Sequence, residues 1–312
     1  MGNYAFGVDI GGTTVKIGLF DKEGCVLDKW EIPTVKDNEG TSILPDVAQS
    51  LLDKMKEKGI EKEDIMGIGV GAPGAVNSEG TIVGGAVNLG WKPFNIPRAL
   101  SAYIDVPVKA VNDANAAAFG EMWQGGGKGY DNMVAVTLGT GVGGGIITDG
   151  RILTGAAGGG GEIGHIHIND EETESCGCKN KGCLEQYASA TGIARLAKRR
   201  LAKDDAPSVL REGSISAKTV FDAVKAGDRV AIEIAEEFGM YLGKGLANVA
   251  NVVNPEIFVI GGGVSKAGEI LLTFVEPEFQ KYAFSACRNA KFALAKLGND
   301  AGIYGAAGLV LR

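Results

Sequence analysis

Apolar and polar residues alternate along the first part of the chain and predict three short strands. Residues 4–10 are mostly apolar, residues 14–20 alternate in polarity, and residues 25–33 end at a proline. An alternation with a period of two is typical of a half-buried β-strand. Glycine-rich and polar turns separate these segments, so we expect an antiparallel meander.

The rest of the chain alternates between apolar runs of strand length and longer segments of helical period. Such an alternation of strands and helices predicts an α/β fold. The expected strands lie at 65–71, 106–111, 256–260 and 292–297, with a hairpin at 132–150. The expected helices lie at 43–58, 97–104, 184–203, 216–226, 228–252 and 301–311, and two more begin at residue 113 and after residue 265.

Two of the predicted hairpins share a turn made of glycine and threonine. The first turn follows Asp9 and reads Ile-Gly-Gly-Thr-Thr, and the second runs from Gly139 to Gly141. Backbone N–H groups of such turns can bind an anion, although each turn alone also fits an ordinary glycine turn. The second turn contains Gly-x-Gly-x-x-Gly, but a strand follows it instead of the helix that a Rossmann turn requires. The repetition predicts two similar halves, each with a phosphate-binding turn.

Several positions at the ends of predicted strands suit a ligand site. Asp9 has a carboxylate that can hold a hydrated Mg²⁺ ion. Asn112 and Asp113 follow the strand at 106–111, and ligand sites of open α/β sheets lie beyond the carboxyl ends of strands. Asp113 also begins a helix, and the local sequence favours a role as its N-cap. The glycines at 261–263, between a strand and a helix, predict a place for the base and ribose of a nucleotide.

Residues 162–185 hold both histidines of the chain and three of its five cysteines. The spacing Cys176-x-Cys178-x4-Cys183 offers three thiolates, and structural zinc takes a fourth nitrogen or sulfur ligand in tetrahedral geometry. His165 and His167 both remain candidates for that ligand. Three reduced thiols in a loop are the alternative, but the segment is polar and has few means of ordering itself without a metal. Four protein ligands would leave no open position, so we expect the metal to be structural.

Composition narrows the class of protein. The chain has 312 residues and a net charge of −7, which argues against nucleic acid as a partner. Its one basic run, residues 198–200, is expected on a solvated helix face. No apolar run is long enough for a membrane span, and no signal peptide is evident, so we expect a cytoplasmic protein. The isolated Cys25 and Cys287 are expected to be buried and inert.

Six motifs occur in a fixed order along the chain. They are D-I-G-G-T from residue 9, G-x-P-G at 71–74, N-D at 112–113, L-G-T-G-x-G-G-G at 138–145, G-E-I-G-H at 161–165 and C-G-C-x3-G-C-L-E at 176–185. The single glycine motifs are weak, but the ordered set is specific and covers essentially the whole chain. Together they resemble the ROK family of sugar kinases and repressors.

The resemblance implies an actin-like, hexokinase-type fold of the ribonuclease H class, with two α/β domains and an interdomain cleft. A small domain would comprise residues 1–112 and 301–312, and a large domain residues 113–300. The implied activity is ATP-dependent phosphorylation of glucose at its 6-hydroxyl. Another hexose or N-acetylhexosamine, such as N-acetylmannosamine, fructose or allose, is the alternative substrate. A homodimer or homotetramer is also implied.

The resemblance also assigns roles to residues. Asp113 would be the general base that takes the proton of the sugar hydroxyl. The sugar would be bound by Gly74, Asn88, Asn112, Asp113, Glu162, His165 and Glu185. ATP and Mg²⁺ would be bound by Asp9, Gly11, Gly12, Thr13, Thr14, Lys16, Gly139, Thr140, Gly141, Gly261, Gly262 and Gly263. Zn²⁺ would be bound by His165, Cys176, Cys178 and Cys183.

Two points qualify the resemblance. The family usually has a glycine after the second cysteine of its metal motif, where this chain has Lys179; the metal ligands need not be disturbed, although the turn there can differ. Repressors with this fold carry a helix-turn-helix segment before the first motif, which here starts at residue 9. The sequence therefore favours the kinase over the repressor. By resemblance, the metal motif favours ATP over polyphosphate as the phosphate donor.

Overall fold

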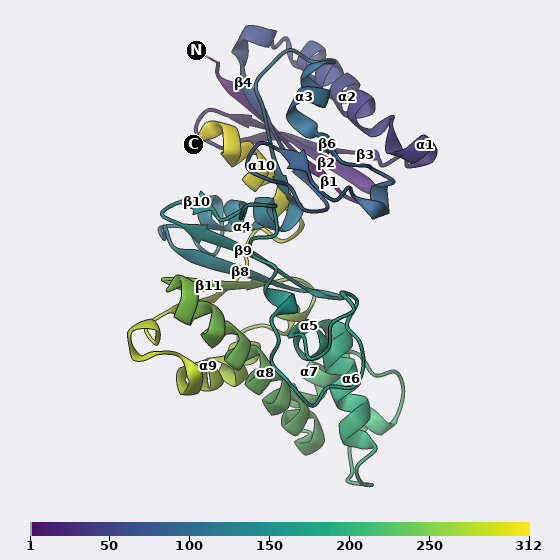
Figure 1. Ribbon diagram of the computed structural model, residues 1–312, viewed down its shortest axis with the longest axis vertical. Coiled ribbons are helices and arrows are strands. Elements are labelled where there is room, and N and C mark those ends of the chain that lie inside the picture. The colour runs from purple at the N-terminus through teal and green to yellow at the C-terminus, as the bar shows by residue number, and fades with distance from the viewer. Residues whose placement is uncertain (1) are drawn as a thin grey trace. The chain divides into compact units, whose positions relative to one another are not determined.

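The computed structural model describes residues 2–312 and has an α/β architecture (Figure 1). Its contacts divide the chain into two compact units. Among the described residues, the first comprises 2–129, 145–161 and 296–312, and the second 130–144 and 162–295. No helix among residues 2–312 is long and apolar enough to cross a membrane.

The first unit is built on a five-stranded sheet with the order β3-β2-β1-β4-β7. Its antiparallel meander is followed by two parallel strands. The strands are β1 (Tyr4–Ile10), β2 (Thr14–Asp21), β3 (Val26–Pro33), β4 (Ile65–Ala72) and β7 (Val108–Asn112). The helices are α1 (Asp37–Gly40), α2 (Ile43–Lys58), α3 (Ile96–Ser101), α4 (Asp113–Gln124) and α10 (Ala301–Leu311). A small hairpin joins β5 (Thr81–Ile82) to β6 (Phe94–Asn95).

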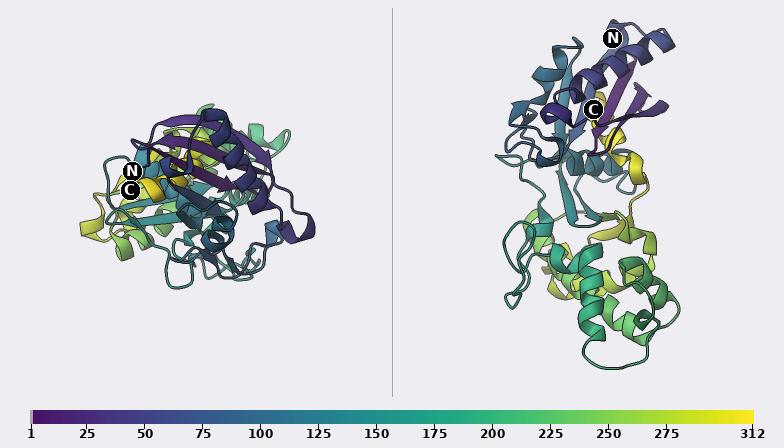
Figure 2. Two further views of the ribbon diagram at one scale, coloured as in Figure 1. Left: turned by 90° about the horizontal axis from the view of Figure 1, so that it is seen from above. Right: turned by 90° about the vertical axis from the view of Figure 1, so that its right-hand side faces the viewer.

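Helix α10 returns the C-terminal end of the chain to the first unit, where it packs on β1, β4 and α4 (Figure 2). Small residues allow this close approach. A Cβ on Gly69 of β4 would lie 1.7 Å from the carbonyl oxygen of Ala306, and one on Gly305 would lie 1.6 Å from that of Ala116. Backbones in such contact admit only glycine. Strand β4 and helix α4 are thereby held against α10.

The second sheet repeats the arrangement of the first, with the order β10-β9-β8-β11-β12. Its strands are β8 (Met133–Leu138), β9 (Val142–Thr148), β10 (Arg151–Ile152), β11 (Ile257–Gly261) and β12 (Lys291–Leu294). The helices of the second unit are α5 (Glu185–Ala188), α6 (Ala190–Leu201), α7 (Ala217–Lys225), α8 (Arg229–Val253) and α9 (Ile270–Tyr282). In each sheet a hairpin precedes two parallel strands. The predicted similarity of the two halves is confirmed.

The predicted strands and most helices are confirmed, with three differences in their bounds. The helix expected at 184–203 is divided into α5 and α6 at Ser189, whose side chain caps α6 by accepting from the Gly192 N–H. The helix expected after residue 265 begins at Ile270, after a 3-10 turn. Strand β12 ends at Leu294, and after Ala295 the Glu121 carboxylate accepts the N–H groups of residues 296 and 297.

Candidate functional site

The first Gly-Thr turn joins β1 to β2 and is closed by the Gly11 N–H, which donates to the Thr14 carbonyl at 3.0 Å. The Thr34 hydroxyl donates to the Gly11 carbonyl at 2.7 Å and fixes the turn from β3. The Lys16 ammonium donates to the Asn299 carbonyl at 3.1 Å, just before α10. The predicted residues 11–14 and Lys16 therefore form one ordered hairpin. Asp9 is the penultimate residue of strand β1, which leads into this turn.

Asp9 has an unusual electrostatic environment. Gly302 of α10 is so close that a Cβ there would lie 2.5 Å from the Asp9 carboxylate. Burial raises the pKa of Asp9, and the neighbouring charge of Asp113 raises it further, to about 6. The Lys16 ammonium opposes this shift. A buried carboxylate beside a second carboxylate favours a bound cation, because the positive charge stabilises the ionised form of both groups.

Asn112 and Asp113 lie where β7 passes into α4. The Asn112 side chain caps the helix by accepting from the Ala114 and Asn115 N–H groups at 2.9 and 3.2 Å. Its amide nitrogen donates to the Gly74 carbonyl at 2.9 Å, which ties the cap to the loop after β4. The expectation that Asp113 is the cap is therefore wrong. Asp113 is the first residue of the helix, and its Oδ1 accepts from the Ala114 N–H at 2.8 Å.

Two loop residues predicted to contact the sugar also lie in the first unit. Gly74 has φ of 95°, and a Cβ there would lie 2.8 Å from the Gly85 carbonyl oxygen. Asn88 lies in the short 3-10 helix Val87–Leu89, and its side-chain nitrogen is 3.8 Å from where a Cβ of Gly12 would be. The structure therefore brings Asn88 to the first Gly-Thr turn.

The second Gly-Thr turn joins β8 to β9. Its Gly139 N–H donates to the Gly141 carbonyl at 2.9 Å. The Val142 N–H, which follows the turn, donates to the Glu185 carboxylate at 2.9 Å. A Cβ on Gly141 would lie 2.1 Å from that carboxylate. Glu185, the first residue of α5, thus packs directly on the turn.

Residues 261–263 follow β11 as expected. Gly262 has φ of 85°, and a Cβ on it would lie 2.5 Å from the Leu138 carbonyl oxygen. The Ser265 hydroxyl donates to the Gly262 carbonyl at 2.8 Å and holds the turn that leads into the 3-10 helix Val264–Ala267. These glycines therefore adjoin the end of β8, where the second Gly-Thr turn begins.

His165, Cys176, Cys178 and Cys183 form a compact cluster whose ligand atoms all lie within 4.8 Å of one another. The Cys178 and Cys183 sulfurs are 3.6 Å apart, and the Cys176 sulfur lies 3.8 Å from His165 Nδ1. Zinc–sulfur bonds of about 2.3 Å in a tetrahedron place the sulfurs roughly 3.8 Å apart, whereas a disulfide needs about 2 Å. The donor set and its spacing fit a structural zinc ion.

The other histidine has different partners. His167 Nδ1 is 2.8 Å from the Lys181 carbonyl, and its Nε2 is 2.8 Å from Asp170 Oδ1. The Asp170 carboxylate raises the pKa of His167. This side chain is about half exposed. The structure thus resolves the choice that sequence spacing left open, in favour of His165 as the member of the cluster.

Lys179 occupies the turn between the second and third cysteines of the cluster. Its φ is 73°, a left-handed conformation that favours glycine. The Lys179 N–H donates to the Cys176 carbonyl at 2.8 Å, so the turn is closed. Lys179 therefore closes the turn in a backbone conformation that favours glycine, and the cysteines on either side of it remain in the cluster.

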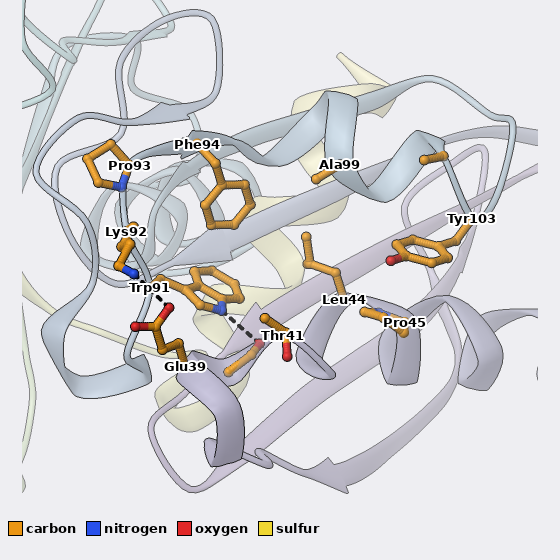
Figure 3. A pocket seen from close by; sticks show the side chains of 12 residues that line it. Glu39, Thr41, Leu44, Pro45, Trp91, Lys92, Pro93, Phe94, Ala99 and Tyr103 are labelled. Carbon is orange, nitrogen blue, oxygen red and sulfur yellow. Dashed lines mark hydrogen bonds and ion pairs between the residues drawn. The ribbon is translucent and has the colours of Figure 1, made fainter.

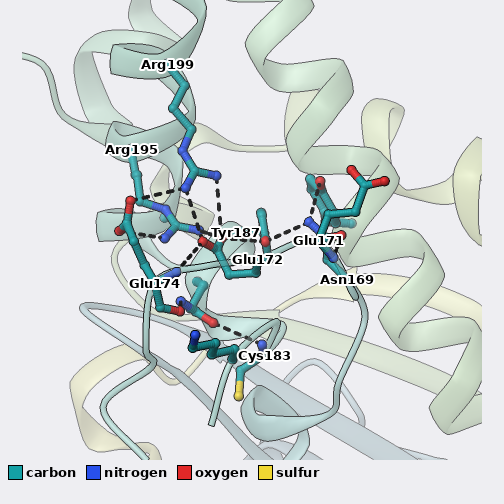
Figure 4. Close-up of polar contacts among 12 residues, drawn as sticks. Asn169, Glu171, Glu172, Glu174, Cys183, Tyr187, Arg195 and Arg199 are labelled. Carbon is teal, nitrogen blue, oxygen red and sulfur yellow. Dashed lines mark hydrogen bonds and ion pairs between the residues drawn. The ribbon is translucent and has the colours of Figure 1, made fainter. Parts of the chain in front are cut away.

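An acidic cluster that the sequence analysis missed orders the segment before the cysteines (Figure 4). The Glu172 side chain is only 1% exposed and pairs with the guanidinium groups of Arg195 and Arg199 from α6. The Tyr187 hydroxyl donates to the same carboxylate at 2.5 Å. Burial raises the pKa of Glu172, but the hydrogen bonds that it accepts outweigh burial and lower it to about 2. The segment is therefore held by an ion cluster as well as by the cysteines.

The basic run at residues 198–200 lies largely on a solvated face, as predicted, since Lys198 and Arg199 are exposed, but its arginines also form ion pairs. Arg199 belongs to the Glu172 cluster, and Arg200 pairs with Glu233 at 2.6 Å and with Asp204 at 3.1 Å. Glu172 and Glu233 each lie more than twenty positions from their arginine partners, so only the fold reveals these two pairs. Cys25 was also expected to be buried, but it is exposed in the β2–β3 turn, where its N–H donates to Asp21. Cys287 is buried, as expected.

Glu162 immediately precedes the 3-10 helix Ile163–His165, and the His165 N–H donates to the Glu162 carbonyl at 3.1 Å. A Cβ on Gly164 would lie 2.1 Å from the Val142 carbonyl oxygen. This short helix therefore packs on the start of β9. Glu162, His165 and Glu185 are all carried by segments that adjoin the residues following the second Gly-Thr turn.

The first unit also contains an apolar cavity of about 490 Å³ that includes none of the predicted site residues (Figure 3). Trp91 and Phe94 form part of its wall. The Trp91 indole N–H donates to the Gly40 carbonyl at 3.0 Å, and Lys92 pairs with Glu39 at 2.9 Å beside the opening.

Comparison with known proteins shows which family has this architecture. The sequence model of the ROK family matches residues 5–312. The chain belongs to the ROK family. It is 44% identical to a glucokinase of Halalkalibacterium halodurans over 97% of this chain and 94% of the relative.

Solved structures of ROK family members are similar along their whole length. A glucokinase of Streptomyces griseus, in complex with glucose and AMPPNP, is 34% identical, covers 98% of each chain and has a TM-score of 0.74. A hexokinase of Thermus thermophilus is 31% identical, covers 97% of this chain and 96% of its own, and has a TM-score of 0.80.

The fold expectation is thus confirmed: this ROK family member has the actin-like, hexokinase-type architecture, with two related α/β halves. The domain boundaries expected from the sequence, 1–112 with 301–312 and 113–300, remain a proposal. The compact units differ from them mainly because α4 packs on α10, both of which lie in the first unit.

Proposed function

We propose that this ROK family protein transfers the terminal phosphate of ATP to the 6-hydroxyl of glucose. The observation that carries the proposal is the 44% identity to a glucokinase over nearly the full length of both chains. The Streptomyces griseus relative, solved with glucose and an ATP analogue, supports the same sugar and donor. Another hexose or an N-acetylhexosamine is the second candidate for the acceptor.

The proposed general base is Asp113. Because Asn112 provides the helix cap, the Asp113 carboxylate is not required for that structural role. A carboxylate at the first turn of a helix can take a proton from a sugar hydroxyl within hydrogen-bond reach. Phosphoryl transfer depends mainly on such positioning and on stabilisation of charge.

The proposed phosphate contacts are the two Gly-Thr turns, residues 11–14 and 139–141. Asp9, whose burial and charged neighbour raise its pKa, and Lys16 would face the phosphates and the magnesium ion. Mg²⁺, when bound, neutralises charge on the transferring phosphate. Residues 261–263 would line the adenosine.

The proposed sugar contacts are polar groups on ordered segments. They are Gly74, Asn88, Asn112, Glu162, His165 and Glu185, with Asp113 as the base. The zinc site would hold His165 by Nδ1, the atom that lies 3.8 Å from the Cys176 sulfur. This leaves the other ring nitrogen of His165 able to donate to a sugar hydroxyl. The metal would act as a structural brace and take no part in the transfer.

The test is ATP-dependent phosphorylation across a panel of hexoses and N-acetylhexosamines, with wild type and Asp113→Asn. We expect glucose to have the highest kcat/KM, and the variant to lose at least a hundredfold in kcat while still binding glucose. Turnover of the variant near the wild-type rate would remove Asp113 from the base role. A preference for another sugar would replace glucose as the substrate.

We also propose a cytoplasmic protein that forms a homodimer or homotetramer and binds neither nucleic acid nor membrane. Light scattering coupled to size-exclusion chromatography tests the assembly. A monomer at micromolar concentration would contradict it.

A further inference from the structure

The second Gly-Thr turn is held by helix α6 through hydrogen bonds to its carbonyl oxygens. The Ala190 N–H donates to the Gly139 carbonyl at 2.8 Å. The Thr191 hydroxyl donates to the Thr140 carbonyl, also at 2.8 Å. Two successive peptide groups of the turn are therefore fixed by two successive residues of α6.

These contacts determine where the amides of the turn point. All peptide bonds among the described residues are trans. In a planar trans peptide, the C=O of one residue and the N–H of the next point in opposite directions. The carbonyls of Gly139 and Thr140 face α6, so the N–H groups of Thr140 and Gly141 point away from it. Two adjacent amides that point to one side form a binding site for an anion such as a phosphate.

Neither the capping of α6 nor the packing of the core requires the hydroxyl of Thr191. Ser189 already caps α6, because its hydroxyl accepts from the Gly192 N–H at 3.0 Å. Thr191 itself is exposed and adds nothing to the core. Its hydroxyl lies 2.9 Å from that of Ser189, which orients it toward the turn.

We propose that Thr191 is a positioning residue for the nucleotide: its hydroxyl fixes the Thr140–Gly141 peptide so that the Gly141 N–H faces a phosphate of ATP. This inference rests on the proposed function for the identity of the anion. Thr191 acts through the turn and does not itself contact the substrate.

The α5–α6 segment also joins the turn to the metal cluster. Glu185 accepts from the Val142 N–H at 2.9 Å with one oxygen, and its other oxygen lies 3.5 Å from the Cys176 sulfur. The segment that bears Thr191 is thus fixed at its start by the cluster. Loss of the metal is expected to disturb nucleotide binding as well as sugar binding.

The test compares Thr191→Val, which removes the hydroxyl at nearly constant volume, with Thr191→Ser, which keeps it. Thr148→Val, at an exposed threonine at the end of β9, is the matched control. We expect Thr191→Val to raise the KM for ATP about five- to tenfold, the effect of one lost hydrogen bond. The glucose KM and the melting temperature should stay near wild type, and Thr191→Ser should restore the ATP KM. Calorimetric titration with ATP alone should show the same loss of affinity.

An ATP KM and affinity of Thr191→Val within twofold of wild type would overturn the proposal. So would an equal loss in Thr148→Val or a failure of Thr191→Ser to restore binding. The titration separates this inference from the proposed function, since it needs no sugar. Wild type that binds ATP but leaves glucose unmodified would refute the function alone, and wild type that does not bind ATP would refute both.

Discussion

Replacing Asp9 with asparagine removes a charge from the end of β1 without changing the shape of the side chain. In the protein without ligands, burial and the nearby Asp113 carboxylate raise the pKa of Asp9 from 3.8 to about 6. Holding this group ionised therefore opposes folding at neutral pH. We expect Asp9→Asn to make the ligand-free protein more stable and the enzyme less active.

The size and the sign of the effect follow from linkage between proton binding and folding. At about 1.4 kcal/mol per pH unit, the shift from 3.8 to about 6 corresponds to about 3 kcal/mol. The folded state binds the proton of Asp9 more tightly than the unfolded state does, so protonation of Asp9 stabilises the fold. This stabilisation is complete below about pH 4 and is lost as the pH rises to about 6. The gain from Asp9→Asn should thus be small near pH 4 and reach about 3 kcal/mol above pH 7.

Thermal unfolding of both proteins between pH 4 and pH 8 provides the assay. With an unfolding entropy of about 2.1 cal/mol/K per residue, 3 kcal/mol raises the melting temperature of a chain of this length by about 5 °C. Asp205→Asn, at an exposed position in the loop after α6, is the control and should change it little at any pH. Mg²⁺ with ATP should stabilise wild type more than Asp9→Asn.

Two results would refute this reasoning. A difference in melting temperature that does not change with pH would mean that the Asp9 charge is not the cause. Equal stabilisation of both proteins by Mg²⁺ and ATP would mean that Asp9 does not face the metal or the phosphates.

Three further predictions concern the segment around the metal cluster. Glu172→Ala should lower the free energy of unfolding by about 1–3 kcal/mol, because it removes the buried carboxylate that accepts from the Tyr187 hydroxyl and leaves Arg195 and Arg199 with Glu174 alone. Glu174→Ala, at an exposed side chain, should lower it by less than about 1 kcal/mol; similar denaturant midpoints for the two variants would contradict this. Atomic emission should find about one zinc per chain in purified wild type. Cys178→Ser should contain much less zinc, and His167→Asn should contain the same amount as wild type. Loss of zinc from His167→Asn alone would reverse the choice of histidine. Lys179→Gly should raise stability by up to about 1 kcal/mol, since it relieves a left-handed lysine, and a lower melting temperature would argue against that strain.

The sequence predicted the elements well because their signals are local. The alternation in residues 4–33 and the helical period of residues 228–252 each reflect one buried face, and β1 to β3 and α8 follow them closely. The doubled Gly-Thr turn predicted the doubled sheet for the same reason, since each turn must connect a hairpin. The four residues of the metal cluster could be proposed because they are close together in sequence and rare in the chain.

The parts that the sequence did not reveal depend on tertiary contacts. Asn112 and Asp113 are both good capping residues, and only the backbone geometry shows that Asn112 caps α4. In the sequence, nothing distinguishes Glu172 from the other acidic residues of its segment. In the fold, Arg195 and Arg199 of α6 pair with it. The hydrogen bond from Thr191 to Thr140 joins residues about fifty positions apart, and no periodicity signals it.

The identity of the phosphorylated product tests the central claim most directly. Purified protein should be incubated with ATP, Mg²⁺ and glucose, and the products analysed by phosphorus NMR and by a glucose 6-phosphate dehydrogenase assay. The account predicts glucose 6-phosphate and ADP in equal amounts, and no such product from Asp113→Asn. ATP hydrolysis without a sugar phosphate, or a phosphate on another hydroxyl, would contradict it.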